Sequence, residues 1–284
     1  MNGGRETEIK SLEYRASRCR RGIIRMIRSG GAGHMGGAMS CMDIITALYF
    51  HTLDVDPENP KKPDRDRFIL SAGHKCMAQY AALAERGFFD ASFLDTYGKL
   101  GTRLPGHPDM AKLPGIEANT GALGHGLSIS VGMALGLRAS GLKSRVFAVM
   151  GDGELPEGSN WEAVSAASHY GLSNLTAFVD ANGLQISGRT ADVMNMAPHE
   201  ARFEAFGWAA VTIDGNDMDE IVRTLDRLPF DPARPSAVIA RTVKGKGLAF
   251  AEDNAAYHYW KPKEEELAAA ERELDDAIRR KEVF

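Results

Sequence analysis

The chain has 284 residues, 44% of them hydrophobic, which is enough to bury one large α/β core or two small ones. Its formal net charge of −4 gives no general attraction to nucleic acid, so a nucleic-acid-binding protein is not expected. No stretch approaches the roughly 20 apolar residues of a membrane span, and Arg25 and Arg28 interrupt the only early apolar segment, so we expect neither a membrane protein nor a signal peptide.

The first half of the chain is expected to form helices joined by glycine-rich turns, with one strand. The basic side chains between Arg15 and Arg28 fit the solvated face of an amphipathic helix better than a nucleic-acid-binding surface. Ser40 is placed to cap the second helix. The expected elements are helices at 6–29, Ser40–Phe50 and Lys75–Arg86, a strand at Arg67–Leu70, and a loop at Leu100–Gly115.

The second half alternates strands with helices. This order predicts an α/β fold with a mainly parallel sheet, helices on both of its faces, and ligands at the carboxyl ends of the strands. We expect a first domain at 1–262 and a helical tail at 263–284 that either packs on a partner or stays solvated. The expected elements are a small-residue helix at Gly121–Ser140, strands at Val146–Met150, Leu175–Asp180, Ala209–Ile213 and Ala237–Ala240, and helices near 158–169, 199–206 and 217–227.

The segment from the first to the second of these strands contains a candidate metal site. The turn Gly151-Asp152-Gly153 ends one strand and Asn182 follows the next, 30 positions after Asp152 (182 − 152), which is about one βαβ unit. Because parallel strands bring their carboxyl ends to the same edge, we expect Asp152 and Asn182 to lie side by side. A carboxylate, an amide oxygen and backbone carbonyls suit Mg²⁺, which completes its octahedron with phosphate and water oxygens.

A Gly-Asp-Gly turn alone is weak support, because most such turns bind nothing. The order strand, GDG, helix, strand and Asn, however, resembles the thiamine-diphosphate enzymes. The resemblance implies that side-chain oxygens of Asp152 and Asn182 and the carbonyl of Leu184 bind Mg²⁺, while Gly153 lets the backbone approach a diphosphate. The alternative is a plain turn in an α/β domain that binds no nucleotide.

Four histidines lie in turn-like surroundings, and the first three each follow a glycine: His34, His74, His107 and His258. Each alone would be an ordinary loop residue, but glycine lets the backbone approach a ligand and an imidazole point into a cleft. Neutral imidazoles can also move protons near pH 7.

The motifs around these histidines narrow the resemblance to the transketolases. They are GHMGG, SAGHKC, GHPD, and TVKGKG followed by His258, together with TGALG at 120–124 and ELPEG at 154–158. The resemblance implies that the four histidines line the substrate channel and that Glu157 lies at a dimer interface. It also implies a cofactor-binding set of His74, Gly121, Leu123, Gly124, Gly151, Asp152, Gly153, Glu154, Asn182, Ile186 and His258. One departure is His125, where the family more often has glutamine; its role stays open.

Single-chain transketolases also carry a second domain that binds the aminopyrimidine ring and supplies its activating glutamate. This chain ends soon after the last diphosphate-domain motif. The resemblance therefore implies the N-terminal subunit of a split transketolase, which a separate pyrimidine-domain subunit would complete in an α₂β₂ assembly. That enzyme would use thiamine diphosphate and Mg²⁺ to move a two-carbon ketol unit from a ketose, by default phosphorylated, to an aldose.

Three other interpretations stay open from the sequence. They are the α subunit of a 2-oxo acid dehydrogenase, an enzyme like deoxyxylulose-phosphate synthase, and a non-catalytic half that binds and regulates a partner. The 2-oxo acid dehydrogenases lack the SAGHKC and GHPD histidines, and the synthase is normally one long chain. A cytoplasmic location is expected, because the three cysteines are widely spaced and form no CxxC pair.

Overall fold

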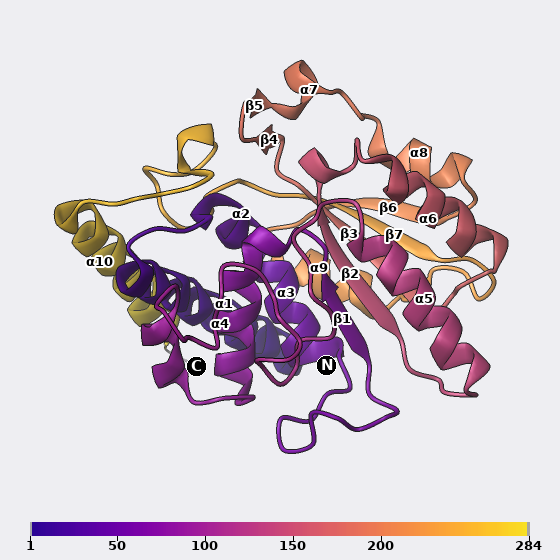
Figure 1. The fold of residues 1–284 in the computed structure, drawn as a ribbon, viewed down its shortest axis with the longest axis horizontal. Helices are drawn as coiled ribbons and strands as arrows, with labels where there is room; N and C mark the ends of the chain where they lie inside the picture. The colour runs from indigo at the N-terminus through magenta and orange to yellow at the C-terminus, as the bar shows by residue number, and fades with distance from the viewer. Residues whose placement is uncertain (1, 283–284) are drawn as a thin grey trace.

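The computed structural model describes residues 2–282 and has a parallel five-stranded sheet between two layers of helices (Figure 1). All four strand pairings are parallel, which confirms the predicted sheet. The strand order is β1-β2-β3-β7-β6, with β1 at Arg67–Leu70, β2 at Val146–Gly151, β3 at Leu175–Ala181, β7 at Ser236–Arg241 and β6 at Ala209–Asp214.

Alternate residues of the buried strands enter two separate cores. In β2, Phe147 and Val149 face one core, while Val146, Ala148 and Met150 face the other. Successive side chains of a strand point to opposite faces, so a strand covered on both sides is apolar throughout. The first face is covered by α1 (Asn2–Gly30), α3 (Met42–Ala47), α4 (Cys76–Arg86) and α9 (Met218–Leu225); the second by α5 (Gly126–Ala139), α6 (Gly158–His169) and α8 (His199–Ala205).

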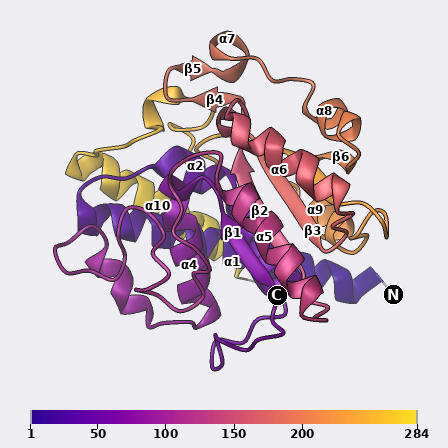
Figure 2. The same ribbon diagram turned by 45° about the vertical axis from the view of Figure 1, so that its right-hand side comes forward.

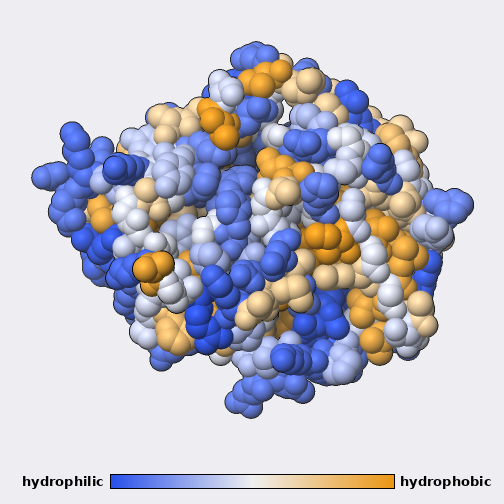
Figure 3. Space-filling model, in the orientation of Figure 1, coloured by the Kyte–Doolittle hydropathy of each residue, from blue (hydrophilic) through white to orange (hydrophobic). Residues whose placement is uncertain are grey.

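The two helical layers differ in how completely they are buried. Figure 2 shows α5 and α6 running along the outside of the sheet, and in Figure 3 hydrophobic side chains gather at the surface on the side where Figure 1 places these helices. Met133, Leu135 and Trp161 pack against the core below but are only partly buried. This layer therefore presents an apolar surface.

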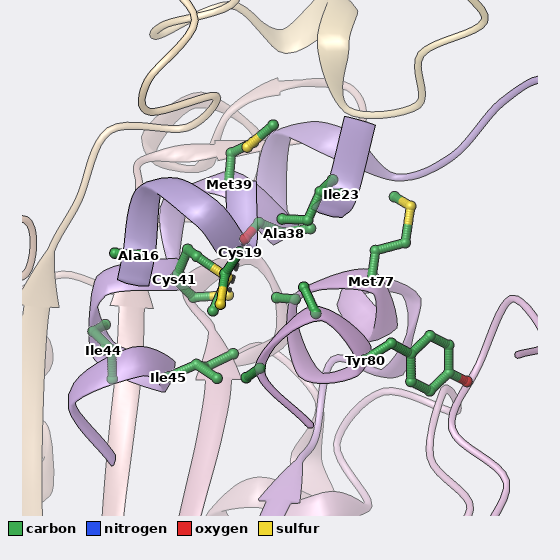
Figure 4. Packing of buried hydrophobic residues seen from close by; sticks show 14 of the residues in the cluster. Ala16, Cys19, Ile23, Ala38, Met39, Cys41, Ile44, Ile45, Met77 and Tyr80 are labelled. Atoms are coloured by element: carbon green, nitrogen blue, oxygen red, sulfur yellow. Dashed lines mark hydrogen bonds between the residues drawn. The ribbon is translucent and has the colours of Figure 1, made fainter. Parts of the chain in front are cut away.

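The first layer has a densely packed interior. Side chains of α1, of α2 (Met35–Ser40), of α3 and of α4 meet there, among them Ile23, Met39, Ile44 and Met77 (Figure 4). The three cysteines of the chain all lie in the described part and are buried free thiols. Small and flexible side chains let the short helices α2 and α3 approach α1 closely.

The C-terminal helix α10 (Glu264–Lys281) packs along α1 rather than standing alone in solvent. Leu267, Ala270 and Leu274 are buried against the first core. Ion pairs also join α10 to α1, among them Arg28 with Glu271 at 2.8 Å. The predicted tail helix is thus present and docked on its own chain, while the domain boundary at residue 263 stays a prediction.

Two sequence predictions of helix starts are wrong. Ser40 ends α2 instead of capping the next helix, because the single proton of its hydroxyl is shared between the Asp180 carboxylate at 2.7 Å and the Gly37 carbonyl at 3.0 Å. Helix α3 begins only at Met42. The helix predicted from Gly121 begins at Gly126, because Gly121 and Gly124 adopt φ values of 138° and 83°. A helix cannot pass through such conformations, which glycine readily adopts.

Short elements not predicted from the sequence complete the fold. They are a π-helical turn at Leu48–Thr52, 3₁₀ turns at Gly73–Lys75, Ala91–Thr96, Asp152–Glu154 and Ala255–Tyr257, the hairpin of β4 (Leu184–Gln185) and β5 (Gly188–Arg189), and α7 (Thr190–Val193). Within residues 2–282, no helix is both long and apolar enough to cross a bilayer.

Docking of α10 can be tested by removing one of its buried side chains. Leu274 is 1% exposed, so Leu274→Ala should lower the free energy of unfolding by about 2–4 kcal/mol, from lost burial and the cavity left behind. Urea denaturation measures this change. Leu100→Ala, the same substitution at a fully exposed leucine, serves as the control and should change stability little. Equal unfolding midpoints for the two variants would mean that α10 does not dock in solution.

Candidate functional site

A cavity of about 340 Å³ opens at the carboxyl edge of the sheet, where the chain leaves β1, β2, β3 and β7. The cavity lies at the edge where folds of this class bind their ligands. Most of the predicted site residues line this cavity: His34, His74, Gly121, Leu123, Gly151, Asp152, Gly153, Glu154, Asn182, Leu184, Ile186 and His258. His107 and Gly124 lie beside it and are not part of its lining.

The turn after β3 wraps around the Asp152 carboxylate. One oxygen of Asp152 accepts a hydrogen bond from the Gly183 amide at 2.7 Å, and the other accepts from Gly153 at 2.9 Å. In the same turn, Leu184 N–H donates to the side-chain oxygen of Asn182 at 3.1 Å. Burial, with a further contribution from Asp180, raises the pKa of Asp152 to about 6. Asp152, Asn182 and Leu184 thus meet in one wall of the cavity, as predicted.

These residues fit a hard cation such as Mg²⁺. Among residues 2–282, no three His, Cys, Asp or Glu side chains gather in a metal-binding cluster. A cation here would depend on one carboxylate, one amide oxygen and one carbonyl, and would take further oxygens from a phosphate group and water. That is the coordination Mg²⁺ prefers, whereas zinc sites are built from cysteine, histidine and carboxylate ligands.

Glu154 connects the loops that surround the cavity. Its carboxylate accepts hydrogen bonds from the Ser71 hydroxyl, from the Gly124 amide at 2.9 Å and from the Gly151 amide at 3.2 Å. These partners follow β1, precede α5 and end β2. The carboxylate of Glu154 thus links three loops by hydrogen bonds within the protein. Burial raises its pKa.

Three imidazoles form a cluster on one side of the cavity. The ring centroids of His34 and His74 are 5.0 Å apart, those of His74 and His258 are 5.4 Å apart, and those of His34 and His258 are 5.5 Å apart. The exposed ring of Tyr259 stands edge-on to His34 at 4.8 Å. The histidines come from the start of α2, the turn after β1 and the loop after β7, so only the fold brings them together.

The cluster is held in its uncharged form. Burial lowers the pKa of His74 to about 2 and that of His258 to about 3, with neighbouring cations adding to the effect. Burial also lowers the pKa of His34. Lys244 Nζ lies 3.0 Å from His258 Nδ1. Since an ammonium can only donate, Nδ1 accepts and Nε2 of His258 carries the proton.

His107 lies at the margin of the cavity. It is exposed, and a Cβ at Gly121 would come within 2.4 Å of its ring, so the imidazole packs directly on the glycine backbone. The Tyr80 hydroxyl holds this loop by sharing its one proton between the carbonyls of Pro105 and His107, each at 3.0 Å. His107 is close enough to lower the pKa of His34. His125 is exposed, immediately before α5, and does not line the cavity.

Sequence reasoning missed two buried lysines, and also Asp180, the acidic partner of one of them. Lys75 and Lys244 both line the cavity; Lys75 pairs with Asp180, and Lys244 donates to the Leu184 carbonyl at 2.9 Å. Burial lowers the pKa of Lys244 to about 8. A signal was available, since Lys75 follows the Gly-His pair after β1 and Lys244 lies three residues after β7. Both positions follow the carboxyl ends of parallel strands.

The amino-acid sequence of this chain is similar to those of several known proteins. Residues 14–277 match the family described as transketolase, thiamine diphosphate binding domain. One subunit of the apulose-4-phosphate transketolase of Phocaeicola vulgatus is 40% identical over 275 residues, spanning 97% of this chain and 98% of that protein. The 6-deoxy-6-sulfo-D-fructose transketolase subunit SqwG of a Clostridium species is 41% identical, spanning 93% of this chain and 96% of that protein.

Longer relatives match over only part of their length. Human transketolase is 36% identical over 254 residues, which is 89% of this chain and 40% of that protein. The crystal structure of transketolase from Campylobacter jejuni superposes with a TM-score of 0.86 at 28% identity, covering 95% of this chain and 45% of that one. This chain therefore spans less than half of these longer proteins.

The neutral histidines predict how stability depends on pH. In the unfolded chain His74 has a pKa near 6.5, and in the folded chain its pKa is about 2. Between these two pH values the unfolded state therefore binds a proton that the folded state does not bind. Stability should therefore fall as the pH falls through 6.5. His74→Gln removes one such group, and its loss of unfolding free energy between pH 7.5 and pH 5 should be smaller than that of the wild type by at most about 2 kcal/mol.

Urea unfolding at the two pH values measures this difference, with the exposed His125→Gln as the matched control. If His74→Gln and His125→Gln lose stability to the same degree as the wild type, the imidazole of His74 is not kept neutral by the fold.

Proposed function

This chain belongs to the transketolase family, and we propose that it is the diphosphate-binding subunit of a transketolase whose site is completed by a separate pyrimidine-domain subunit. The coverage of its relatives supports this proposal: the chain spans 98% and 96% of two relatives that are named as subunits, but only 40% of human transketolase. The partner would supply the groups around the aminopyrimidine ring. We further propose an α₂β₂ assembly.

The proposed cofactors are thiamine diphosphate and Mg²⁺. Thiamine diphosphate, when bound, supplies a nucleophilic carbon that cleaves the bond beside a ketose carbonyl. Asp152, Asn182 and the Leu184 carbonyl would hold Mg²⁺ against the diphosphate. Lys244 is a buried cation beside them and would balance the negative charge of the diphosphate.

The histidine cluster would act on the sugar. The Nε2–H of His258 can donate to a sugar oxygen, and the uncharged His34 and His74 can each donate one hydrogen bond and accept another. His107, at the margin, would contact the part of the ketose that extends toward the opening. The three clustered imidazoles are neutral near pH 7, so they can hydrogen-bond the hydroxyl groups of a sugar as donors or acceptors.

The single observation that carries this proposal is that three neutral imidazoles line the same cavity as Asp152, Asn182 and Leu184. The reaction we propose is transfer of a two-carbon ketol unit from a ketose to an aldose. A phosphorylated ketose is the default donor, and branched or sulfonated sugars extend the proposal because related subunits are named for apulose 4-phosphate and for 6-deoxy-6-sulfo-D-fructose.

The outer face of α5 and the region of Glu157 are the proposed contacts between subunits. Among the described residues, nothing lies within 4 Å of a Cβ built at Gly132 or Gly136, so this stripe of α5 is open, and the apolar surface in Figure 3 adjoins it. We place the assembly in the cytoplasm, a proposal supported by the three buried free thiols.

Reconstitution tests the split-site proposal. The pure chain should fold but should not transfer ketol units, because the pyrimidine-binding groups belong to the partner. Addition of the pyrimidine-domain subunit should give transfer that depends on thiamine diphosphate and Mg²⁺, measured by a coupled assay over phosphorylated, unphosphorylated, branched and sulfonated ketoses. An Asp152→Ala chain with the same partner should be inactive. Turnover by the chain alone would contradict the proposal.

Two histidine variants should fail in different ways. His107→Ala and His258→Ala should both lower kcat/KM for the donor sugar by roughly 10²–10⁴. Only His258→Ala should also weaken cofactor binding, because His258 lines the cavity and contacts Lys244 while His107 does neither. Donor kinetics and cofactor Kd of the reconstituted enzyme separate the two effects. His169→Ala, at the far end of α6, is the control, and wild-type kinetics in both site variants would show that these histidines are ordinary loop residues.

A further inference from the structure

Lys75 lies in the cavity wall but is already bound to a partner within the protein. Its Nζ is 2.5 Å from an oxygen of Asp180, and the two side chains are 4% and 0% exposed. The stem of the lysine runs against the backbone of α2, where a Cβ at Gly37 would come within 2.9 Å of Lys75 Cε. Lys75 is therefore a fixed cation, unlike an extended surface lysine.

The partner of Lys75 also holds the predicted metal ligand. The same oxygen of Asp180 accepts from Lys75, from the Ser40 hydroxyl at 2.7 Å and from the side-chain amide nitrogen of Asn182 at 3.1 Å. The other oxygen accepts from the Thr242 hydroxyl. A carboxylate with these four donors has its position and its plane determined by the surrounding protein.

We propose that Lys75 is a positioning residue that, through Asp180, fixes the orientation of the Asn182 amide and so directs its oxygen toward the cation site. An asparagine amide has one donating and one accepting end. Because the nitrogen of Asn182 is bound to Asp180, its oxygen must face the opposite way, toward the Leu184 amide and the wall that contains Asp152. This inference rests on the proposed function for its cation site.

The two lysines of the cavity therefore have different tasks. Lys244 contacts a backbone carbonyl and an imidazole, neither of them charged, so its cation is available to an anionic ligand. Lys75 is committed to Asp180. Removing it would leave a buried carboxylate without a cation, which is costly. Asp180 would relax toward water or toward another donor, and Asn182 would follow because it is bound to the same oxygen.

The test compares full-length Lys75→Met with the wild type. Methionine keeps most of the length of the stem and removes the charge. The side-chain amide signals of Asn182 in an ¹⁵N–¹H NMR spectrum, assigned with an Asn182→Asp chain, should shift or split. Affinity for Mn²⁺ as probe, measured by electron paramagnetic resonance with thiamine diphosphate present, should fall by about 10–100-fold, as is typical when a group supporting a metal ligand is lost.

Two further variants keep the test decisive. Lys246→Met removes a half-buried lysine two residues after Lys244, with its Nζ 3.7 Å from Glu252, and should change neither readout. Ser40→Ala removes a neutral donor to the same Asp180 oxygen. It should shift the Asn182 signals in the same direction as Lys75→Met, but by a smaller amount. It therefore replaces Lys75→Met in the test if that variant does not fold.

A folded Lys75→Met chain with wild-type Asn182 signals and wild-type Mn²⁺ affinity would overturn the proposal, and so would a lowered Tm without any change in those signals. Failure of the proposed function looks different. In that case the Asn182 signals still respond to Lys75→Met, but the wild-type chain with its partner transfers no ketol unit.

Discussion

The buried carboxylate of Asp180 joins four segments that are far apart in the sequence. Ser40 at the end of α2, Lys75 at the start of α4, Asn182 after β3 and Thr242 after β7 all donate to it. A fully buried charge is tolerated only when it is paired and hydrogen-bonded. The Asp180 carboxylate therefore holds these four segments together. In turn, each segment must keep its position for Asp180 to keep its hydrogen bonds.

A second buried carboxylate, that of Glu154, joins loops that line the cavity. Its bonds to Ser71, Gly124 and Gly151 link the ends of β1 and β2 with the turn that precedes α5. With both carboxylates in place, the loops that carry the predicted ligands are supported by rigid strands and by each other. Such support is what precise positioning of a cofactor and a cation requires.

Charged and neutral groups are grouped separately in the cavity. One wall has the oxygens of Asp152, Asn182 and Leu184 beside the Lys244 ammonium, which suits a cation and a diphosphate together. Next to Lys244 lie the imidazoles, whose pKa values burial lowers far below 7, so they are uncharged donors and acceptors. Charge is thus concentrated where a charged cofactor would bind, and neutral groups where a sugar would bind.

The sequence by itself determined the alternation of strands and helices, the parallel sheet, and the placing of Asp152 and Asn182 at one edge. Apolar periodicity and the succession of strands and helices along the chain are local properties, so they can be read from the sequence. It also identified the glycine-flanked histidines. It did not reveal that His34, His74 and His258 touch, that Ser40 serves Asp180 instead of a helix, or that Lys75 and Lys244 enter the cavity. The Lys75–Asp180 and Ser40–Asp180 bonds join residues 105 and 140 positions apart. Only tertiary packing decides which of many polar side chains meet over such separations, since no local pattern records them.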